Sequence, residues 1–492
     1  MHKLLESIEK NLLKYGTAAI IMAVPLFPKF PLIRLPGTYV SIRLEDFLIA
    51  LVALFWLFSF WHQRVKFFKD NLNRIILGYL TIGFLSLFSA IFLTQTVEPH
   101  IALFHTIRRV EYLMVFFIMV ASIKSRKDVR FFAQVFLLTA FLVFLYGLGQ
   151  KFFMFPVIST MNVEFAKGMA LRLSPGARVS STFAGHYDLG AYLVLLLSFL
   201  MAYIVATKKK MRRVPLLFFF GFLFWLLLAS ASRISFAAYL GSMTITLFLL
   251  KKKSWIIPVL VLSLVTSVFA SELTERYANT LRVSLLKIGE IKIELPWIQK
   301  SAQISFLPEP TPTPTPAPAV VPVKGPKKII KVMPQPTPTP TPGKRYFYYG
   351  GVGSEPPPED RSTAIRLKVE WPRAIRAFLK NPLLGTGYSS ITLATDNDYL
   401  RALGEIGLLG FLAFVMIFIG IGLKAKEIIF SKTPIEGEKA ILIGIVGGTI
   451  GFLANALFID VFEASKAAIT FWLLMGLVIG ISKISFSKEK NQ

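Results

Sequence analysis

The sequence contains no cysteine among its 492 residues. Disulfides, cysteine-ligated metal sites and thiol nucleophiles are therefore excluded. Charge is scarce as well, since only 17% of the residues are charged, whereas soluble chains carry about 25%. The apolar residues make up 54% of the chain and form runs long enough to cross a bilayer. These features predict an all-α polytopic membrane protein.

Acidic residues are the scarcer charged class, with 28 Asp and Glu against 55 Lys and Arg. A net charge of +27 suggests a nucleic-acid partner at first sight. However, the basic residues fall largely in short loops between apolar runs, where positive charge sets the orientation of a membrane protein. No basic run is combined with a soluble fold, so we expect no nucleic-acid partner.

About twelve apolar segments are predicted to cross the membrane as helices. They are residues 15–28, 44–61, 74–93, 107–122, 129–149, 187–206, 213–229, 231–250, 254–271, 398–423, 437–459 and 466–482. The predicted organisation is nine helices within residues 1–271, a large loop over 272–397, three helices within 398–482 and a tail over 483–492.

The distribution of Lys and Arg predicts the orientation of these helices. Both tails and alternate loops are basic, at residues 3–14, 64–74, 124–130, 208–213, 251–253, 424–432 and 483–490. The positive-inside rule therefore places both termini in the cytoplasm and the loop 272–397 on the extracytoplasmic side.

The large loop has three predicted parts. Its first part carries a short amphipathic helix near residues 281–293. Residues 308–342 repeat Thr-Pro, and proline-rich chains form extended tethers without a packed core, so this insertion is predicted to be disordered. Its composition also resembles an O-glycosylated stalk. From residue 363 the helical spacing of Trp371, Ile375 and Phe378 predicts a helix, which Asn381 and Pro382 terminate.

Arginines near the outer ends of the predicted helices are candidate binding residues. The guanidinium group donates two parallel hydrogen bonds to phosphate oxygens, so these arginines suggest a pyrophosphate or another anionic head group at the outer face. Two simpler interpretations remain open: Arg108 with Glu111 as an ion pair, and Arg366 as part of a solvated helix face. The candidates are Arg178, Arg233, Arg366 and Arg373.

Two residues are candidate general bases. Asp396 lies beside a predicted helix end, where two compatible roles are open: a base on an acceptor hydroxyl, and the cap of the helix that begins near Asp398, assisted by the Asn397 amide. His186 is the one histidine in a motif-like position, and it is either structural or catalytic. The sequence has no zinc-binding spacing, Ser-His-Asp spacing or Walker loop, so no metal or cofactor is expected.

The stretch NPLLGTGYSS, followed by DNDYLRALGEIGLLGF, resembles the O-antigen ligase/polymerase superfamily, the Wzy-C-type membrane glycosyltransferases. Ligases of this family carry His, then Asn, Ser or Gln, then Gly-x-x-Gly at a fixed spacing. Asn397 occupies the second position here, and Gly407 and Gly410 match the two glycines. The pair Ser232–Arg233 resembles the Ser-Arg of the family, and the segment from Arg178 resembles one that enters a middle helix.

The resemblance implies a GT-C-like fold of about twelve helices with one large extracytoplasmic loop, in a bacterial cytoplasmic membrane. It implies transfer or polymerisation of a glycan from a polyprenyl-pyrophosphate carrier onto a glycan, lipid or protein acceptor, with no metal or cofactor. Arg233 matches the hairpin arginine, and Arg366 approximately matches the arginine that precedes the loop tryptophan, here Trp371. The remaining expected substrate-binding residues are Arg178, Arg373, Asn397, Tyr399, Gly385, Gly387 and Glu405.

One position departs from the ligase pattern, because Asp396 stands where a ligase carries histidine. Either Asp396 or His186 then serves as the base, or the acceptor is activated differently. The departure favours a polymerase or a protein O-oligosaccharyltransferase of the same superfamily over a lipopolysaccharide ligase. A polysaccharide transporter or lipid flippase is the alternative of another class, but the internal hydropathy repeats and mid-helix charges expected of it are not seen.

Overall fold

The computed structural model describes residues 2–34, 41–61, 64–160, 168–174, 176–269, 365–392, 394–432, 434 and 437–489. All of them belong to one structural unit of the chain, residues 1–283 and 348–492. The predicted amphipathic helix at 281–293 and the Thr-Pro insertion at 308–342 lie outside the described residues.

The described residues are mainly helical, as the apolar composition predicts. The first half contains α1 (His2–Leu26), β1 (Ile33–Arg34), β2 (Ser41–Ile42), α2 (Leu44–Trp61), α3 (Arg64–Lys69), α4 (Asn71–Phe92), α5 (Pro99–Ser122), α6 (Arg126–Phe153), β3 (Val157–Ile158) and β4 (Ala170–Leu171). The second half contains α7 (His186–Ala206), α8 (Lys210–Ala229), α9 (Arg233–Leu249), η2 (Lys253–Trp255), α10 (Ile256–Val268), η3 (Arg366–Glu370), α13 (Trp371–Lys380), α14 (Asp398–Ile429), α15 (Gly437–Asn455) and α16 (Ser465–Glu489).

Each predicted membrane segment overlaps one of these helices. By length and composition, seven of them can cross a membrane, namely α4, α6, α7, α8, α14, α15 and residues 465–485 of α16. Shorter apolar segments lie at residues 11–26, 233–249 and 253–268. The chain is thus a helical membrane protein, and the count of twelve crossings stays a prediction. α5 begins at Pro99, eight residues before the predicted fourth segment.

Two helices form the centre of the unit. The apolar windows of α7 and α16 are 83% and 89% buried, whereas those of α4 and α8 are only 39% and 28% buried. α15 packs mainly against α7 and α9, α16 packs against α5, and α14 packs against α4. A Cβ atom at Gly448 of α15 would lie 2.9 Å from the Leu195 carbonyl oxygen of α7. Small residues of this kind allow membrane helices to approach closely.

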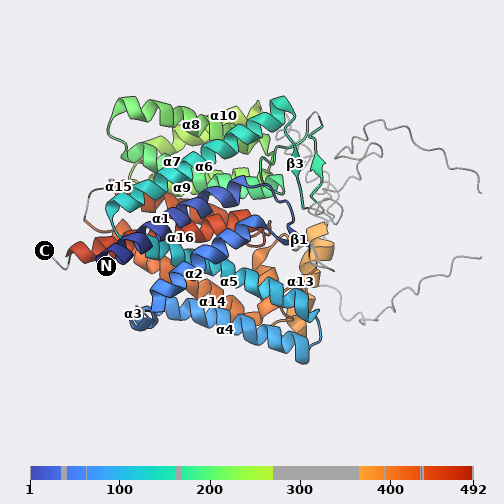
Figure 1. Ribbon diagram of the computed structural model, residues 1–492. Coiled ribbons are helices and arrows are strands. Elements are labelled where there is room, and N and C mark those ends of the chain that lie inside the picture. The colour runs from blue at the N-terminus through green and yellow to red at the C-terminus, as the bar shows by residue number, and fades with distance from the viewer. Residues whose placement is uncertain are drawn as a thin grey trace, which may run out of the picture. The chain divides into compact units, whose positions relative to one another are not determined.

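The helix ends gather into two groups. The beginning of α1 and the end of α16 lie at one end of the bundle, and β1, β3 and α13 lie at the other (Figure 1). The β1–β2 hairpin pairs Ile33 with Ile42, and the β3–β4 pair joins Val157 to Leu171. Arg233 at the start of α9 and Asp396 before α14 belong to segments that are hydrogen-bonded to the same end of α15.

α14 is broken at Gly407, whose φ of 66° and ψ of −172° are not helical. The turn before α14 forms backbone hydrogen bonds with α14 on both sides of this break. Leu408 N donates to the Pro382 carbonyl (2.8 Å), and Gly387 N donates to the Glu405 carbonyl (2.8 Å). Gly385 and Gly387 have φ values of 70° and 90°, a region that favours glycine. The backbone of this turn therefore lies directly against the backbone of α14.

We predict that Gly407→Ala destabilises the protein. The observed φ and ψ lie in a region that is populated essentially by glycine alone, and a Cβ atom there would collide with the Leu383 backbone. The apparent free energy of unfolding in detergent should fall by about 2 kcal/mol or more. Gly422→Ala on the same helix is the control, because no atom lies within 4 Å of its Cβ position. Equal stability of the two variants would contradict this account of the break.

Candidate functional site at the α13 end of the bundle

The entrance of α14 carries an ion pair that joins two predicted residues. Arg366 Nε and NH2 both donate to Asp396 Oδ2, at 2.9 and 2.7 Å. No described residue is hydrogen-bonded to the other carboxylate oxygen, Oδ1. Arg366 is only 7% exposed, so its interpretation as part of a solvated helix face is wrong. The arginine holds the carboxylate at one oxygen and leaves the second oxygen for another partner.

Asp460, in the loop between α15 and α16, organises the backbone on both sides of Asp396. Its carboxylate accepts hydrogen bonds from Thr395 N (2.8 Å), Asn397 N (3.2 Å) and Arg401 NH2 (3.2 Å). Asp396 itself has a left-handed φ of 49°, which aspartate tolerates better than most residues. The neighbouring amides bind Asp460, and this arrangement fixes the conformation that pairs Asp396 with Arg366.

Three carboxyl groups influence one another at this entrance. Burial, followed by the Asp396 carboxylate, raises the pKa of Glu370 to about 7 against the opposing effect of Arg366. Asp460 adds to the same rise, and Arg373 opposes it. Burial also raises the pKa of Asp396, against the lowering effect of Arg366. Glu370 Oε2 is buried and has no hydrogen-bond partner, so this group is placed to exchange a proton near neutral pH.

Three of the other residues predicted near α14, Asn397, Tyr399 and Glu405, form hydrogen bonds within the protein. Asn397, not Asp396, is the N-cap of α14, because its Oδ1 accepts from Leu400 N (2.9 Å); the alternative role of Asp396 as the cap is wrong. Tyr399 OH donates to the Leu453 carbonyl (2.8 Å), and the side chain of Glu405 accepts from Arg401 NH1 (3.3 Å). Arg373 NH1 is buried without a hydrogen-bond partner.

The predicted hairpin between α8 and α9 is confirmed, and it places Arg233 at the first position of α9. Ser232 caps this helix, and its hydroxyl donates to Ser235 Oγ (2.8 Å), which donates in turn to Asn455 Oδ1 (2.9 Å). A chain of buried hydrogen bonds thus ties the start of α9 to the end of α15.

The segment before α7 lies against the same hairpin. Val179 N donates to the Ala229 carbonyl (3.0 Å). Beside it, Arg178 NH1 donates to His186 Nε2 (3.0 Å), since a guanidinium group can only donate. The two predicted residues of this segment are therefore paired with each other, close to the hairpin that carries Arg233.

The end of α15 connects the hairpin to the entrance of α14. Asn455 accepts from Ser235 of the hairpin, and the carbonyl of the next residue, Ala456, accepts from Asp398 N (2.9 Å). Farther along, the Asp398 carboxylate accepts from Phe462 N (3.1 Å). The predicted residues, which are scattered between positions 178 and 405, are thus held by one polar framework at the same end of the bundle.

A cavity of about 530 Å³ opens beside this framework. Four cationic residues contribute to its wall, namely Lys29, Arg43, Arg108 and Arg401, together with the acids Glu98 and Glu463 and with His105. The remaining wall is mostly polar or aliphatic and comes from the α4–α5 connection and from residues 389–392. Arg401 belongs to both features, since it lines the cavity and binds Asp460.

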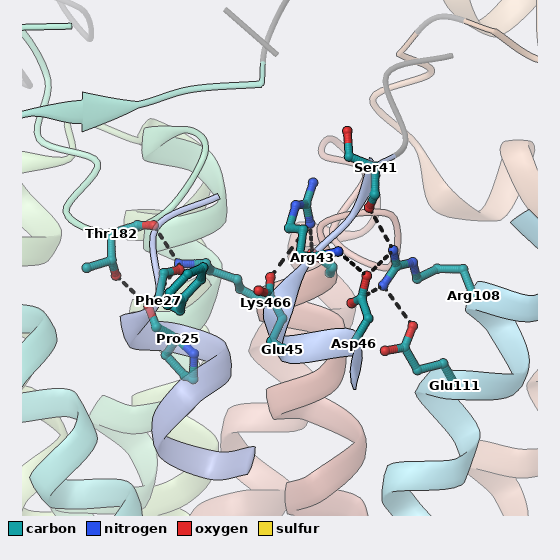
Figure 2. Close-up of polar contacts among 11 residues, drawn as sticks. Pro25, Phe27, Ser41, Arg43, Glu45, Asp46, Arg108, Glu111, Thr182 and Lys466 are labelled. Atoms are coloured by element: carbon teal, nitrogen blue, oxygen red, sulfur yellow. Dashed lines mark hydrogen bonds and ion pairs between the residues drawn. The ribbon is translucent and has the colours of Figure 1, made fainter. Parts of the chain in front are cut away.

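Arg108 is fixed from three sides in the cavity wall (Figure 2). Its NH1 donates to Asp46 Oδ1 (2.6 Å) and to Glu111 Oε2 (2.7 Å), and its NH2 donates to the Ser41 carbonyl (3.3 Å). The ion pair predicted for Arg108 and Glu111 is confirmed. A carboxylate of α2 also participates, which the sequence order alone did not indicate.

Lys466, at the start of α16, holds the segments behind the cavity together. Its ammonium group donates to the carbonyl oxygens of Pro25 (3.0 Å), Phe27 (2.7 Å) and Thr182 (2.6 Å). Figure 2 shows its side chain reaching between the end of α1 and the segment before α7. Three bonds satisfy all three donors of the ammonium group, so Lys466 connects three segments that are distant in sequence.

Sequence reasoning missed Lys29, Arg43, His105, Glu370 and Lys466. His105 lies in no motif-like stretch of the sequence, yet it lines the cavity. The available signal was a charged or titratable side chain within a few residues of a predicted helix end, in a segment on the outer side of the membrane. Among the described residues no cluster of three or more His, Asp or Glu side chains is suited to hold a metal ion.

Comparison with known protein families gives one match. The family model Wzy_C, described as O-antigen ligase, matches residues 218–415. This match confirms the resemblance seen in the sequence. The matched region contains Arg233, Arg366 and Asp396, but not Arg178, His186 or the cavity residues from α1 to α5. No curated protein matched the chain.

We predict that Arg366→Gln raises the pKa of Asp396 further. Burial already raises this pKa, and the guanidinium charge is the main opposing influence, so its removal favours the protonated carboxyl. Infrared titration of the protonated carboxyl band, with Asp396→Asn to assign it, measures the change. Arg376→Gln on the exposed face of α13 is the control. A pKa that is unchanged in Arg366→Gln would show that the ion pair is not formed in the membrane.

Proposed function

We propose that this protein is a membrane glycosyltransferase of the O-antigen ligase/polymerase type. It transfers or polymerises a glycan from a polyprenyl-pyrophosphate carrier onto an acceptor hydroxyl at the outer face of a bacterial cytoplasmic membrane. The observation that carries the proposal is the Arg366–Asp396 pair at the entrance of α14, which lies inside the region that matches the O-antigen ligase family.

The reaction requires a proton acceptor and a site for a departing diphosphate. The acceptor oxygen forms a bond to the sugar carbon that carries the diphosphate, on the face opposite the leaving group. The bond between that carbon and the diphosphate oxygen breaks, and its electron pair leaves with the diphosphate. The proton of the acceptor hydroxyl moves to a carboxylate. Inversion at the sugar carbon follows from this geometry.

Asp396 is the better candidate for the proton acceptor. Its Oδ1 has no hydrogen-bond partner among the described residues, and Arg366 orients the carboxylate through Oδ2. In contrast, the Nε2 lone pair of His186 accepts a hydrogen bond from Arg178. Glu370, next to Asp396, is a second carboxyl group with a pKa near neutrality. A general base is most efficient when its pKa lies near the working pH.

Arginine side chains stabilise the charge that develops on the leaving diphosphate. Arg233 at the start of α9 and Arg366 at the entrance of α14 are proposed for this role, with Arg178 as a further contributor. Arg233 and Arg366 lie in segments that are distant in sequence. Hydrogen bonds of Asn455, Ala456 and Asp460 connect these segments. Fixed donors that face developing negative charge are a major source of rate enhancement.

The acceptor class is tested by removing the gene and analysing the cell surface. Loss or shortening of a surface polysaccharide supports a ligase or polymerase, and loss of glycans from proteins supports a protein O-oligosaccharyltransferase. The deletion strain then serves as host for every variant. An unchanged pattern of polysaccharides and glycoproteins would contradict the proposed glycan transfer.

Arg233→Ala should reduce glycan transfer by about a hundredfold or more in the complemented strain, because one fixed donor to the developing charge is lost. Membrane insertion and protein level should not change. Arg212→Ala is the matched control, since Arg212 is exposed at the opposite end of α8. Normal transfer by Arg233→Ala would remove Arg233 from the proposed site.

The transfer rate should rise as the pH increases through about 7. Below that value Glu370 is protonated, because burial raises its pKa to about 7, and the carboxyl pair at the α14 entrance then lacks one proton acceptor. Glu370→Gln should remove the rise of the transfer rate near pH 7, and Asp396→Asn should abolish transfer at every pH. The pH profiles of purified wild type and variants in lipid nanodiscs provide the measurement. A wild-type profile that is retained in Glu370→Gln would exclude Glu370 from proton transfer.

A further inference from the structure

We propose that α13 is an interfacial helix that lies on the bilayer surface at its end of the bundle. Ile375 and Leu379 enter the boundary between head groups and acyl chains, and Arg376 and Lys380 bind the phosphates of anionic phospholipids. The partner of this surface is the lipid itself. The contact would exist whatever group the protein transfers.

α13 is too short to cross a bilayer. Its ten residues, Trp371–Lys380, span about 15 Å, whereas the hydrocarbon core is about 30 Å thick. One side of the helix packs on α14, because Ala374 is buried and a Cβ atom at Gly404 would lie 2.9 Å from the Ala374 carbonyl oxygen. Figure 1 shows α13 lying across the end of the bundle.

The side of α13 next to this contact is apolar and exposed. Ile375 and Leu379 are both exposed, and 66% of the Leu379 surface is accessible. Residues four apart lie on the same face of a helix, so these two side chains form one apolar strip. Single exposed apolar residues are common on protein surfaces, but an apolar strip on a short helix is typical of contact with another apolar phase.

The apolar strip continues onto the lateral surface of α14. Leu383, in the turn after α13, is 60% exposed, and its carbonyl accepts a hydrogen bond from Leu409 N (3.2 Å). Leu409 and Leu412 are in turn exposed on α14, which is one of the helices that can cross a membrane. The acyl chains that surround α14 therefore also reach α13, which identifies lipid as the occupant of the strip.

The beginning of α13 meets a second exposed apolar segment. The rings of Trp371 and Phe458 have centroids 6.4 Å apart, and Leu457 and Phe458, which follow α15, are both exposed. Tryptophan is enriched at membrane–water interfaces, because its ring is apolar and its N–H group is polar. Exposed apolar side chains thus extend from the end of α15 along α13 to the first part of α14.

The next face of α13 is cationic. Arg376 and Lys380 are exposed and are also four residues apart. The sequence of α13 contains no aspartate or glutamate, so no carboxylate of the helix offsets these charges. Basic residues beside an apolar helix face bind the phosphates of anionic lipids, and their aliphatic stems cover apolar surface. This charge complementarity specifies an anionic phospholipid surface.

The lipid contact positions the candidate site. Arg366, which binds the Asp396 carboxylate, belongs to η3, and η3 continues directly into α13. A helix that is held at the bilayer surface therefore fixes the depth of the Arg366–Asp396 pair relative to the lipid phosphates. The packing of α13 on α14 at Gly404 transmits the same constraint to the entrance of α14.

The absence of cysteine from the chain allows the contact to be measured with single spin labels. Ile375→Cys and Leu379→Cys are labelled in the full chain, in nanodiscs of equal parts phosphatidylcholine and phosphatidylglycerol. Both labels should be relaxed more by oxygen than by a water-soluble nickel chelate, at a depth of about 5–10 Å below the phosphates. Leu412→Cys is the reference for lipid, and Lys252→Cys, exposed at the opposite end of the bundle, is the reference for water.

Three results would overturn the proposal. Equal relaxation by the nickel chelate at Leu379→Cys and Lys252→Cys would place the apolar strip in water. Protection of Leu379→Cys from both reagents, in nanodiscs and in detergent, would show that another segment of this chain covers the strip. Dipolar broadening at Leu379→Cys that disappears on dilution with unlabelled protein would assign the strip to a contact between two copies.

The role of the cations is tested at the same position. A fluorophore on Leu379→Cys is quenched by phosphatidylglycerol or phosphatidylcholine that carries a nitroxide on its acyl chain. Phosphatidylglycerol should quench more strongly, and Arg376→Gln or Lys380→Gln should each lower the ratio of the two quenching efficiencies by up to about fivefold. The ratio should also fall at high salt. Lys252→Gln is the matched control, because Lys252 is an exposed cation at the opposite end of the bundle.

A ratio that is unchanged when Arg376→Gln and Lys380→Gln are combined would refute the binding of anionic phosphates at α13. Both substitutions remove exposed charges, so the thermal stability of the protein should stay at the wild-type value. Neither the depth measurement nor the quenching measurement uses glycan transfer. A protein that transfers no glycan but shows the expected depth of Leu379→Cys would refute the proposed function and leave the interfacial helix intact.

Discussion

The carboxylate of Asp460 is the interaction on which the candidate site depends. It binds the backbone amides of Thr395 and Asn397 and the guanidinium of Arg401. Without it, the left-handed conformation of Asp396 would have no support from the neighbouring backbone, and Arg401 would lose one of its two carboxylate partners. A carboxylate that accepts several charge-assisted or amide hydrogen bonds is stable in a buried setting where an unpaired one is not. One acidic side chain from the α15–α16 loop thereby fixes the geometry of Asp396, which lies just before α14 and pairs with Arg366 of η3.

Electrostatic compensation is uneven across this end of the bundle. Most buried charges are paired locally, as in Arg108 with Asp46 and Arg366 with Asp396, or are satisfied by carbonyl oxygens, as in Lys466. Such pairs and bonds offset the desolvation of each ion. The pairing is incomplete around Lys29 and Arg43, on the wall formed by the first helices, and around Glu370 near the α14 entrance. Incomplete compensation lowers stability, and titratable groups with such perturbed surroundings gather at functional sites.

The helices were predictable from the sequence because apolar runs of bilayer length have few alternative structures. The hairpin at Ser232 and Arg233 and the end of α13 at Asn381 were also predictable, since polar, Gly or Pro residues interrupt an apolar or amphipathic pattern there. Prediction failed where contacts between segments distant in sequence determine the surroundings of a residue. Nothing near Lys29 in the sequence indicates that α16 and α5 complete a cavity around it, and nothing near Asp396 points to Asp460, which lies beyond two helices. The cap of α14 was assigned only approximately, because Asp396 and Asn397 are both good N-cap residues.

Consecutive residues at the end of α15 serve two different helices: Asn455 binds Ser235 of α9, and the Ala456 carbonyl binds Asp398 N of α14. Farther down the same helix, Gly444 and Gly448 are packed closely against α7. An α-helix turns by about 100° for each residue. The insertion or deletion of a single residue between the glycines and Asn455 would rotate both contacts away from their partners, although it would change the apolar length very little. The number of residues in this part of α15 is therefore constrained. Related sequences should tolerate changes of residue type along it far better than insertions or deletions.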